Sequence, residues 1–108
     1  VKELNVVGID TNLGQAALIR GPELVVVKDH YRPNGERAIT SLFPMAGTMA
    51  ENIAWYQKSA EEVFQDWCDS PGHDNSQTNS HYSNIGIAVF VQKTKYGSYN
   101  YHFVQLFS

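Results

Sequence analysis

The apolar residues in the first third of the chain recur at helical spacing. Within residues 12–26 they form one helical face, which consists of Leu13, Ala16, Ala17, Ile19 and Leu24. Three residues that commonly cap helices, Asp10, Thr11 and Asn12, come directly before this run. Gly21 and Pro22 interrupt it, and a proline inside a helix removes one backbone donor and crowds the preceding turn. We therefore predict a helix over residues 12–26 that is kinked near Pro22 or divided into two shorter helices.

A second helix is predicted over residues 59–68, in the segment SAEEVFQDWC. Ser59 and Glu62 have the spacing of a capping box, in which the hydroxyl and the carboxylate each accept a hydrogen bond from a free backbone N–H. Pro71 with Gly72 is expected to end this helix. Its apolar stripe consists of Ala60, Val63, Phe64 and Trp67. The single cysteine, Cys68, follows the stripe directly, has no partner for an internal disulfide and is expected to be a buried thiol.

The apolar pattern changes to a period of two in the last third of the chain. The segments NIGIAVFVQ and YNYHFVQLF are rich in β-branched and aromatic residues, and KTKYGS between them has the composition of a hairpin turn. Both segments carry apolar residues on both faces, so helices should cover the sheet on both sides. The pattern predicts an α+β fold, a three-layer α-β-α sandwich with a small, mostly antiparallel sheet, in which residues 1–108 form a single domain.

Charge and hydropathy exclude two classes of function. The chain has 8 Lys and Arg against 11 Asp and Glu, a formal net charge of −3, and so lacks the basic surface that binding to nucleic acid requires. No apolar run reaches the roughly 18 residues of a membrane-spanning helix. The sequence begins at Val1 without a charged and then apolar leader, so we expect that a signal peptide, if there was one, has been removed.

Four short blocks carry a resemblance to a known family. AENIA (residues 50–54), SPGH (70–73), HYSNIGIAV (81–89) and YHFVQLF (101–107) resemble, in this order, the signature blocks of the CAP superfamily of cysteine-rich secretory, antigen 5 and pathogenesis-related 1 proteins. The upstream segments AALIRGPEL and HYRPNGERAIT resemble the corresponding region of its bacterial, SCP-like members. The absence of paired cysteines also fits that branch. Each block alone is a weak signal, but together they cover about residues 11–107 with matching spacing.

The resemblance implies an α-β-α sandwich, secretion and a central cleft that binds a divalent cation in some members. Two histidines and two acidic residues form that cleft. His30 matches the histidine before the RPNG turn, Glu51 matches the glutamate of the GENI block, and His73 matches the histidine of SPGH. The second acidic position is occupied by Ser70. The resemblance thus implies a site in which the two histidines are the ligands for zinc or another divalent cation.

The chain departs from the family pattern at two places. The usual GHRANIL is GHDNSQT here, so the turn after His73 is expected to be irregular. Most members also begin with a longer N-terminal helix that covers one face of the sheet, and only VKELN corresponds to it. The usual first helix is therefore expected to be missing. A bare apolar face favours self-association, so a homo-oligomer is among the expected partners.

Several interpretations of the cleft residues stay open. In the first, the chain is a secreted binding module, with or without a metal ion, whose extracellular ligand is a protein, a lipid or a small molecule. In the second, Glu51 and the two histidines only tie the helices together. In the third, which is the weaker, Ser70, His73 and Glu51 are the nucleophile, base and orienting acid of a protease-like hydrolase, although a serine before Pro71 is also common in turns. Lipid or sterol binding is a further alternative.

Overall fold

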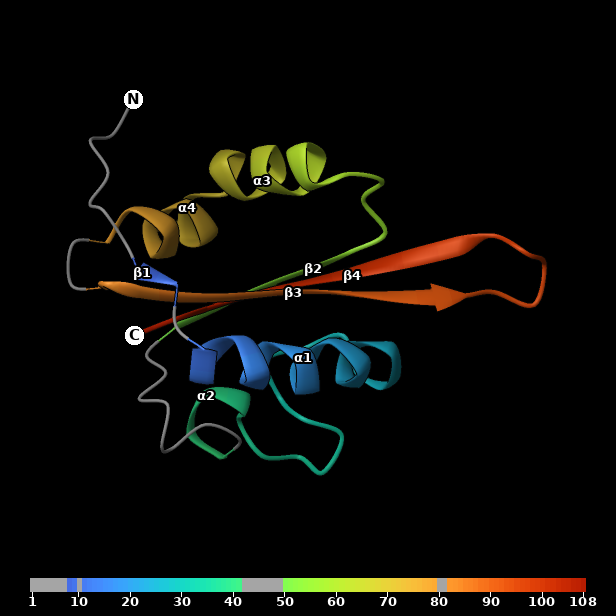
Figure 1. Ribbon diagram of the computed structural model, residues 1–108, viewed down its shortest axis with the longest axis horizontal. Helices are drawn as coiled ribbons and strands as arrows, with labels where there is room; N and C mark the ends of the chain where they lie inside the picture. The colour runs from blue at the N-terminus through green and yellow to red at the C-terminus, as the bar shows by residue number, and fades with distance from the viewer. Residues whose placement is uncertain (1–7, 10, 42–49, 80–81) are drawn as a thin grey trace.

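The described part of the chain forms eight helices and strands. The computed structural model describes residues 8–9, 11–41, 50–79 and 82–108 (Figure 1). In chain order the elements are β1 (Gly8–Ile9), α1 (Thr11–Val26), α2 (Ala38–Ser41), β2 (Ala50–Trp55), α3 (Ala60–Asp69), α4 (Pro71–Thr78), β3 (Asn84–Lys93) and β4 (Tyr99–Phe107). The segment VKELN lies outside the described residues, and so does the expectation about a missing first helix.

The strands form one sheet in the order β1-β3-β4-β2. β3 and β4 are a hairpin in which Ile85 pairs with Phe107, and β2 pairs antiparallel with the other side of β4. β1 is parallel to β3 and pairs only with its first two residues, Asn84 and Ile85. The hairpin turns at Gly97, whose positive φ of 84° is a conformation that glycine adopts without strain. The predicted small, mostly antiparallel sheet is confirmed.

Helices lie on both faces of the sheet, as predicted. Figure 1 shows α1 and α2 on one face and α3 with α4 on the other. The larger core lies between α1 and the sheet and consists of Leu13, Ala16, Ala17, Leu24, Ile53, Ala88, Val104 and Leu106. A smaller cluster on the other face consists of Ala54, Val63, Trp67 and Phe103. β4 lies between β3 and β2, and its residues 102–107 are buried.

Helix α1 approaches the sheet closely enough to exclude side chains at the contact. A Cβ atom at Gly86 of β3 would lie 2.2 Å from the carbonyl carbon of Leu13. About two turns farther along α1, a Cβ atom at Gly21 would lie 2.9 Å from the Cβ of Phe90 on β3. The two glycines therefore set the distance between α1 and the sheet.

The structure corrects two expectations about α1. It is one continuous helix through Pro22, so a division into two helices is wrong. The carbonyl that Pro22 leaves without its helical donor is that of Leu18, a residue 65% exposed, where water can replace the missing N–H. Ile19, predicted to lie in the apolar stripe, is 51% exposed, and the neighbouring Arg20 is buried instead.

The capping prediction for α3 holds, but its buried stripe is narrower than expected. Ser59 Oγ accepts a hydrogen bond from the Glu62 N–H at 3.1 Å, while the Glu62 carboxylate accepts one from the Lys58 N–H instead of from Ser59. Val63 and Trp67 are buried, whereas Ala60 and Phe64 are exposed. The helix contacts the sheet along a single ridge of side chains, and that ridge does not include the two exposed positions.

The segment that starts with Pro71 is a regular helix, and the irregular turn expected after His73 is wrong. Ser70 separates α3 from α4, so Pro71 takes the first position of α4. Proline suits that position because its fixed φ is helical and its missing N–H would have no partner there. His73 therefore lies in the first turn of a helix.

One face of β3 is less covered than the pattern suggested. Ile87, Val89 and Val91, which alternate along the strand, are 59%, 45% and 47% exposed. α1 covers the opposite face of the same strand, where Gly86 and Ala88 are buried. The prediction that helices cover both faces of the sheet thus holds for β4 and is wrong for residues 87–91 of β3.

Candidate functional site

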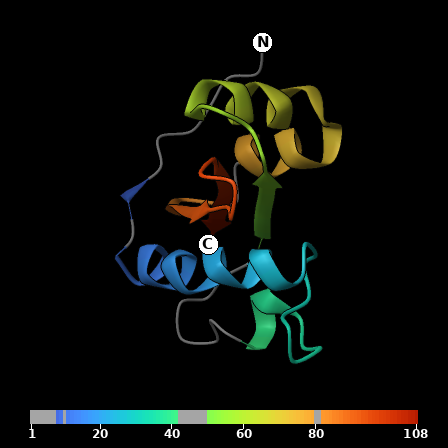
Figure 2. The same ribbon diagram turned by 90° about the vertical axis from the view of Figure 1, so that its right-hand side faces the viewer.

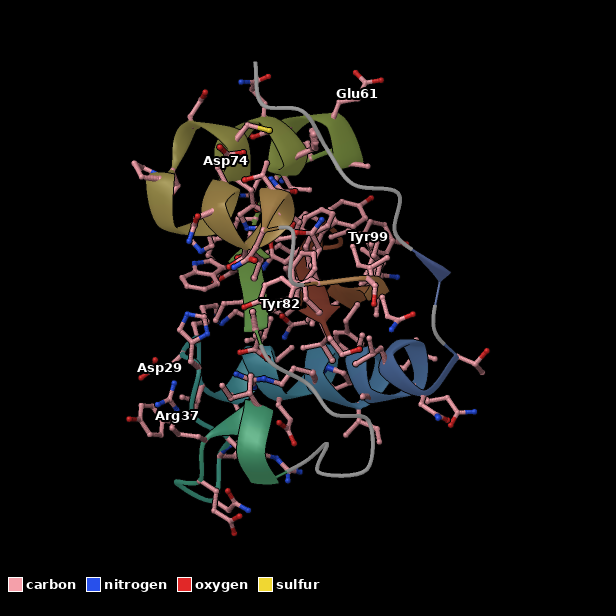
Figure 3. All side chains as sticks on the ribbon, turned by 90° about the vertical axis from the view of Figure 1, so that its left-hand side faces the viewer. Asp29, Arg37, Glu61, Asp74, Tyr82 and Tyr99 are labelled. Carbon is pink, nitrogen blue, oxygen red and sulfur yellow. The ribbon has the colours of Figure 1, made fainter. Side chains whose placement is uncertain are left out.

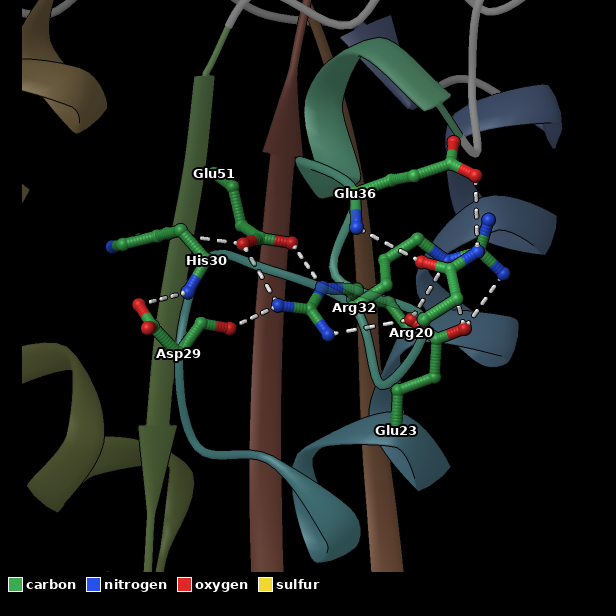
Figure 4. Close-up of polar contacts among 8 residues, drawn as sticks. Arg20, Glu23, Asp29, His30, Arg32, Glu36 and Glu51 are labelled. Atoms are coloured by element: carbon green, nitrogen blue, oxygen red, sulfur yellow. Dashed lines mark hydrogen bonds and ion pairs between the residues drawn. The ribbon is translucent and has the colours of Figure 1, made fainter.

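A buried ion pair fixes the position of Glu51. Glu51 lies on β2, and Arg20 reaches it from α1, with Nε 2.7 Å from Oε2 (Figure 4). The Arg20 side chain is fully buried and that of Glu51 is 1% exposed. Arg20 also donates to the backbone carbonyl of Asp29 and forms an ion pair with Glu23, which in turn binds Arg32. The ion pair with Arg20 thus holds the Glu51 carboxylate in one position on the edge strand β2.

His30 forms a hydrogen bond with the other oxygen of the Glu51 carboxylate. It lies in the loop between α1 and α2, and its Nδ1 is 3.0 Å from Glu51 Oε1. The His30 side chain is 48% exposed, so one side of the ring faces solvent. Because an ionised carboxylate only accepts hydrogen bonds, Nδ1 carries the proton of the neutral ring. The lone pair is then on Nε2, the atom that faces away from Glu51.

His73 and Ser70 form a second pair in the other helical layer. Ser70 Oγ lies 2.8 Å from His73 Nδ1, so either group can donate the hydrogen bond. Asn52 of β2 donates to the His73 carbonyl at 3.0 Å and holds α4 on the sheet. Burial lowers the pKa of His73 below its ordinary value, and electrostatic repulsion from His30 when that ring is protonated lowers it further. The ring is therefore neutral at physiological pH and available as a ligand.

The two pairs line two hollows at the edge strand β2. His30 and Glu51 line a hollow of 220 Å³, and Ser70 and His73 line one of 280 Å³. The larger hollow is mostly apolar, and its other lining residues are Ile53, Ala54, Trp55, Gln57, Asp66 and Trp67. Figure 3 shows Asp29, the neighbour of His30, beside the α1 layer, and Asp74, the neighbour of His73, on α4 across the sheet. Of the four predicted residues, Glu51 thus lies on β2, His30 lies on one side of the sheet, and Ser70 and His73 lie on the other.

The described residues do not form the full sets that a structural metal site or a catalytic triad requires. Among residues 8–9, 11–41, 50–79 and 82–108, no three His, Cys, Asp or Glu side chains form a group that could hold a metal ion. The reason lies in Glu51, whose oxygens face Arg20 and His30. For the same reason Glu51 does not orient His73. Of the predicted Ser70–His73–Glu51 arrangement, the contact between Ser70 and His73 is present, and the contact between His73 and Glu51 is not.

The residue that sequence reasoning missed is Arg20. It occupies the position between Ala16 and Leu24 in the apolar stripe of α1, where a charged residue is rarely found. An arginine at such a position requires a carboxylate partner, because burying an unpaired charge is prohibitive. That rule could have predicted a buried ion pair from the sequence, although not which carboxylate completes it.

Comparisons with known proteins agree with this architecture. A family model described as CAP, the cysteine-rich secretory protein family, matches residues 2–107. A solved outer surface protein from Borrelia burgdorferi has a TM-score of 0.67 at 18% identity, over 95% of this chain and 78% of that chain. A cysteine-rich secretory protein from Staphylococcus aureus has a TM-score of 0.64 at 17% identity, over 97% of this chain and 33% of that one. At these identities the likeness shows the fold. None of the curated proteins matches the sequence.

Proposed function

Because the chain belongs to the CAP, or cysteine-rich secretory protein, family, we propose that it is an extracellular or cell-surface binding module whose two histidines hold a divalent cation. The observation that supports this proposal is that both histidine rings use Nδ1 for a hydrogen bond, His30 to Glu51 and His73 to Ser70. Both Nε2 atoms are thereby left as candidate metal ligands.

The partners of Nδ1 are those that support a metal-binding histidine. A carboxylate that accepts from one ring nitrogen fixes the tautomer and makes the other nitrogen a better ligand. Glu51 has this role for His30, and Arg20 holds Glu51 in place. Ser70 can accept from His73 in the same way. Arg20, Glu51 and Ser70 are positioning residues in this proposal, and the histidines are the ligands.

The nature of the ligands favours zinc. Neutral imidazole binds zinc and other late transition metals better than it binds magnesium or calcium. Two protein ligands would leave coordination positions for water or for an external ligand, as in open zinc sites. A bound cation would supply a positive charge between the two hollows, where it could polarise a carbonyl or carboxylate group of that ligand.

The volumes of the two hollows limit the size of the ligand that they could hold. Volumes of 280 and 220 Å³ are below the roughly 300–1,000 Å³ of pockets that enclose drug-sized molecules. They favour a small polar group or an extended side chain over a sterol. Trp55 and Trp67, which line the larger hollow, provide an apolar surface that such a side chain could contact.

The location at the cell surface rests on family membership and on the neighbours. One neighbour is named an outer surface protein and the other a cysteine-rich secretory protein. In the described part of the chain no helix is long and apolar enough to cross a membrane.

Zinc titration followed by the nitrogen chemical shifts of the histidine rings tests the metal proposal. Near neutral pH we expect zinc to shift Nε2 of His30 and His73 and to leave buried His102 unchanged as an internal control. The shifts should disappear near pH 5, where protons compete for the rings. His30→Ala and His73→Ala should each abolish saturable binding, whereas Asn75→Ala, an exposed residue of α4, should not. Zinc binding that survives the His30→Ala, His73→Ala double substitution would contradict the proposal.

A further inference from the structure

Within the part of the chain that the structure describes, the outer edge of β3 is open along most of its length. Asn84 and Ser108 exchange both backbone hydrogen bonds, at 3.0 and 3.1 Å. In an antiparallel pair such exchange alternates, so the even-numbered residues of β3 bond to β4 and the odd-numbered ones direct N–H and C=O outward. Among the described residues, β1 pairs with the outer edge only at Asn84 and Ile85. The backbone groups of Ile87, Val89 and Val91 therefore face outward beyond β1.

The same three residues expose their side chains. Ile87, Val89 and Val91 are 59%, 45% and 47% exposed, and Tyr99, opposite Lys93 in the hairpin, is 49% exposed. Figure 2, viewed from the hairpin end, shows β3 on the outer side of the hairpin with β1 farther along that side. Figure 3 labels Tyr99 at this side of the molecule. A long, apolar, unpaired edge strand is a surface that another strand can extend.

We propose that β3 of one molecule pairs antiparallel with β3 of a second copy, about a two-fold axis at Val91. The paired sheets would share the outward N–H and C=O groups of both edges. The apolar side chains of the two β3 strands would form one continuous strip on the face opposite α1. The partner is a second copy because this edge is self-complementary in length, direction and charge.

The position of β1 determines where the axis can lie. β1 already pairs with the first two residues of β3, so the hairpin turn of the second copy cannot extend along this edge past Gly86. An axis at Val91 gives the longest pairing that keeps each turn clear of the β1 of the other copy. Val91 then faces Val91 of the second copy, and Val89 faces Lys93.

Charge agrees with this register. Lys93 and Lys95 are the charged residues at the turn end of the strand, and both are exposed. An axis at Lys93 would set two like charges opposite each other, which is unfavourable. With the axis at Val91, each lysine lies beside an aliphatic residue, and its methylene stem can cover apolar surface while the amine stays in water.

The self-association of charge variants tests the proposal. Sedimentation velocity from micromolar to submillimolar concentrations should show a monomer–dimer equilibrium for the unaltered chain. Val91→Lys should abolish the dimer, because two lysines would meet on the axis. The control is Val26→Lys at the end of α1, a valine that is 72% exposed against 47% for Val91 and lies outside β3, which should leave the dimer unchanged. A monomer at all concentrations, or equal behaviour of the two variants, would overturn the proposal.

Engineered cysteines test the register separately. In a Cys68→Ser background, Val91→Cys should give a disulfide-linked dimer under mild oxidation, because residues on the axis face each other. Val89→Cys, two residues away on the same edge, should cross-link much less. More cross-linking at position 89 than at position 91 would overturn the assigned axis.

Discussion

At the scale of the residue, His102 is an ionisable group in an apolar environment. Its side chain is fully buried on β4, between the rings of Tyr56 and Phe90, and neither ring nitrogen has a hydrogen-bond partner among the described residues. Burial lowers its pKa below 6.5, and the charge of Lys28 acts in the same direction. The backbone of Phe90 acts in the opposite sense, without a hydrogen bond of good geometry. The ring is therefore neutral in the folded state.

This environment predicts a loss of stability in mild acid. Because the unfolded chain binds protons near pH 6.5 and the folded ring binds them only at lower pH, the free energy of unfolding falls as pH drops below about 6.5. His73, whose pKa is also lowered, contributes in the same direction. His102→Leu should flatten this dependence in urea denaturation and leave stability near neutral pH unchanged or up to about 2 kcal/mol higher. An unchanged pH dependence in the variant would contradict the assignment.

Ser70 separates the binding interpretation from the enzymatic one. Its hydroxyl contacts His73, but it makes no side-chain capping bond to α4. We expect Ser70→Ala to cost at most about 1 kcal/mol of stability and to weaken zinc binding, because His73 loses its orienting partner. Any hydrolytic activity should stay the same. A serine-directed probe that labels Ser70, with labelling lost in the variant, would favour a hydrolase.

At the scale of the element, the contact between α1 and β3 depends on Gly86. Ala at this position would place Cβ inside the backbone of α1, 2.2 Å from the carbonyl carbon of Leu13. Neither backbone can move without disturbing the core, so Gly86→Ala should destabilise the fold by about 3 kcal/mol or more. Gly72→Ala in α4 is the matched control. Its Cβ would have no neighbour within 4 Å, and the helix should gain about 0.5–1 kcal/mol. Thermal or urea unfolding of the two variants measures both effects.

The connection between α1 and β2 depends on the Arg20–Glu51 ion pair. Each single substitution, Arg20→Met or Glu51→Gln, should cost about 3–5 kcal/mol, because the remaining charge is buried without its partner. The double variant should recover much of that loss, since it leaves no uncompensated charge. A double-mutant cycle of unfolding free energies measures the coupling. Additive losses would show that the two side chains act independently. Glu51→Gln should also weaken zinc binding, because His30 loses its acceptor.

At the scale of the whole molecule, the two helical layers differ in how firmly they are attached. The core on the α1 side is the larger, whereas α4 has no buried residue. Local opening needs less energy where little apolar surface is buried. Amide hydrogen exchange should therefore be slowest in residues 102–107 of β4 and fast throughout α4. Bound zinc should slow exchange in the first turn of α4, where His73 lies. Protection of α4 equal to that of β4 would contradict this ranking.

The sequence by itself determined the elements whose signals are local. The 3.6-residue period indicated α1, the capping box indicated α3, and the two-residue period with its turn indicated the β3–β4 hairpin. Together these elements implied the layers, because each apolar face must be buried against another element. The motif blocks indicated His30, Glu51, Ser70 and His73, and the structure places Glu51 on β2 and the other three next to it.

Only the tertiary structure decided which groups meet and which surfaces stay bare. Arg20 and Glu51 are 31 residues apart, and His30 and Glu51 are 21 apart, so no local pattern could join them. The sequence predicted a bare apolar face, but periodicity does not show which residues a helix covers, so the exposure of Ile87, Val89 and Val91 in particular was not predicted. Pairing and coverage depend on how distant segments pack, and a sequence pattern describes only neighbours along the chain.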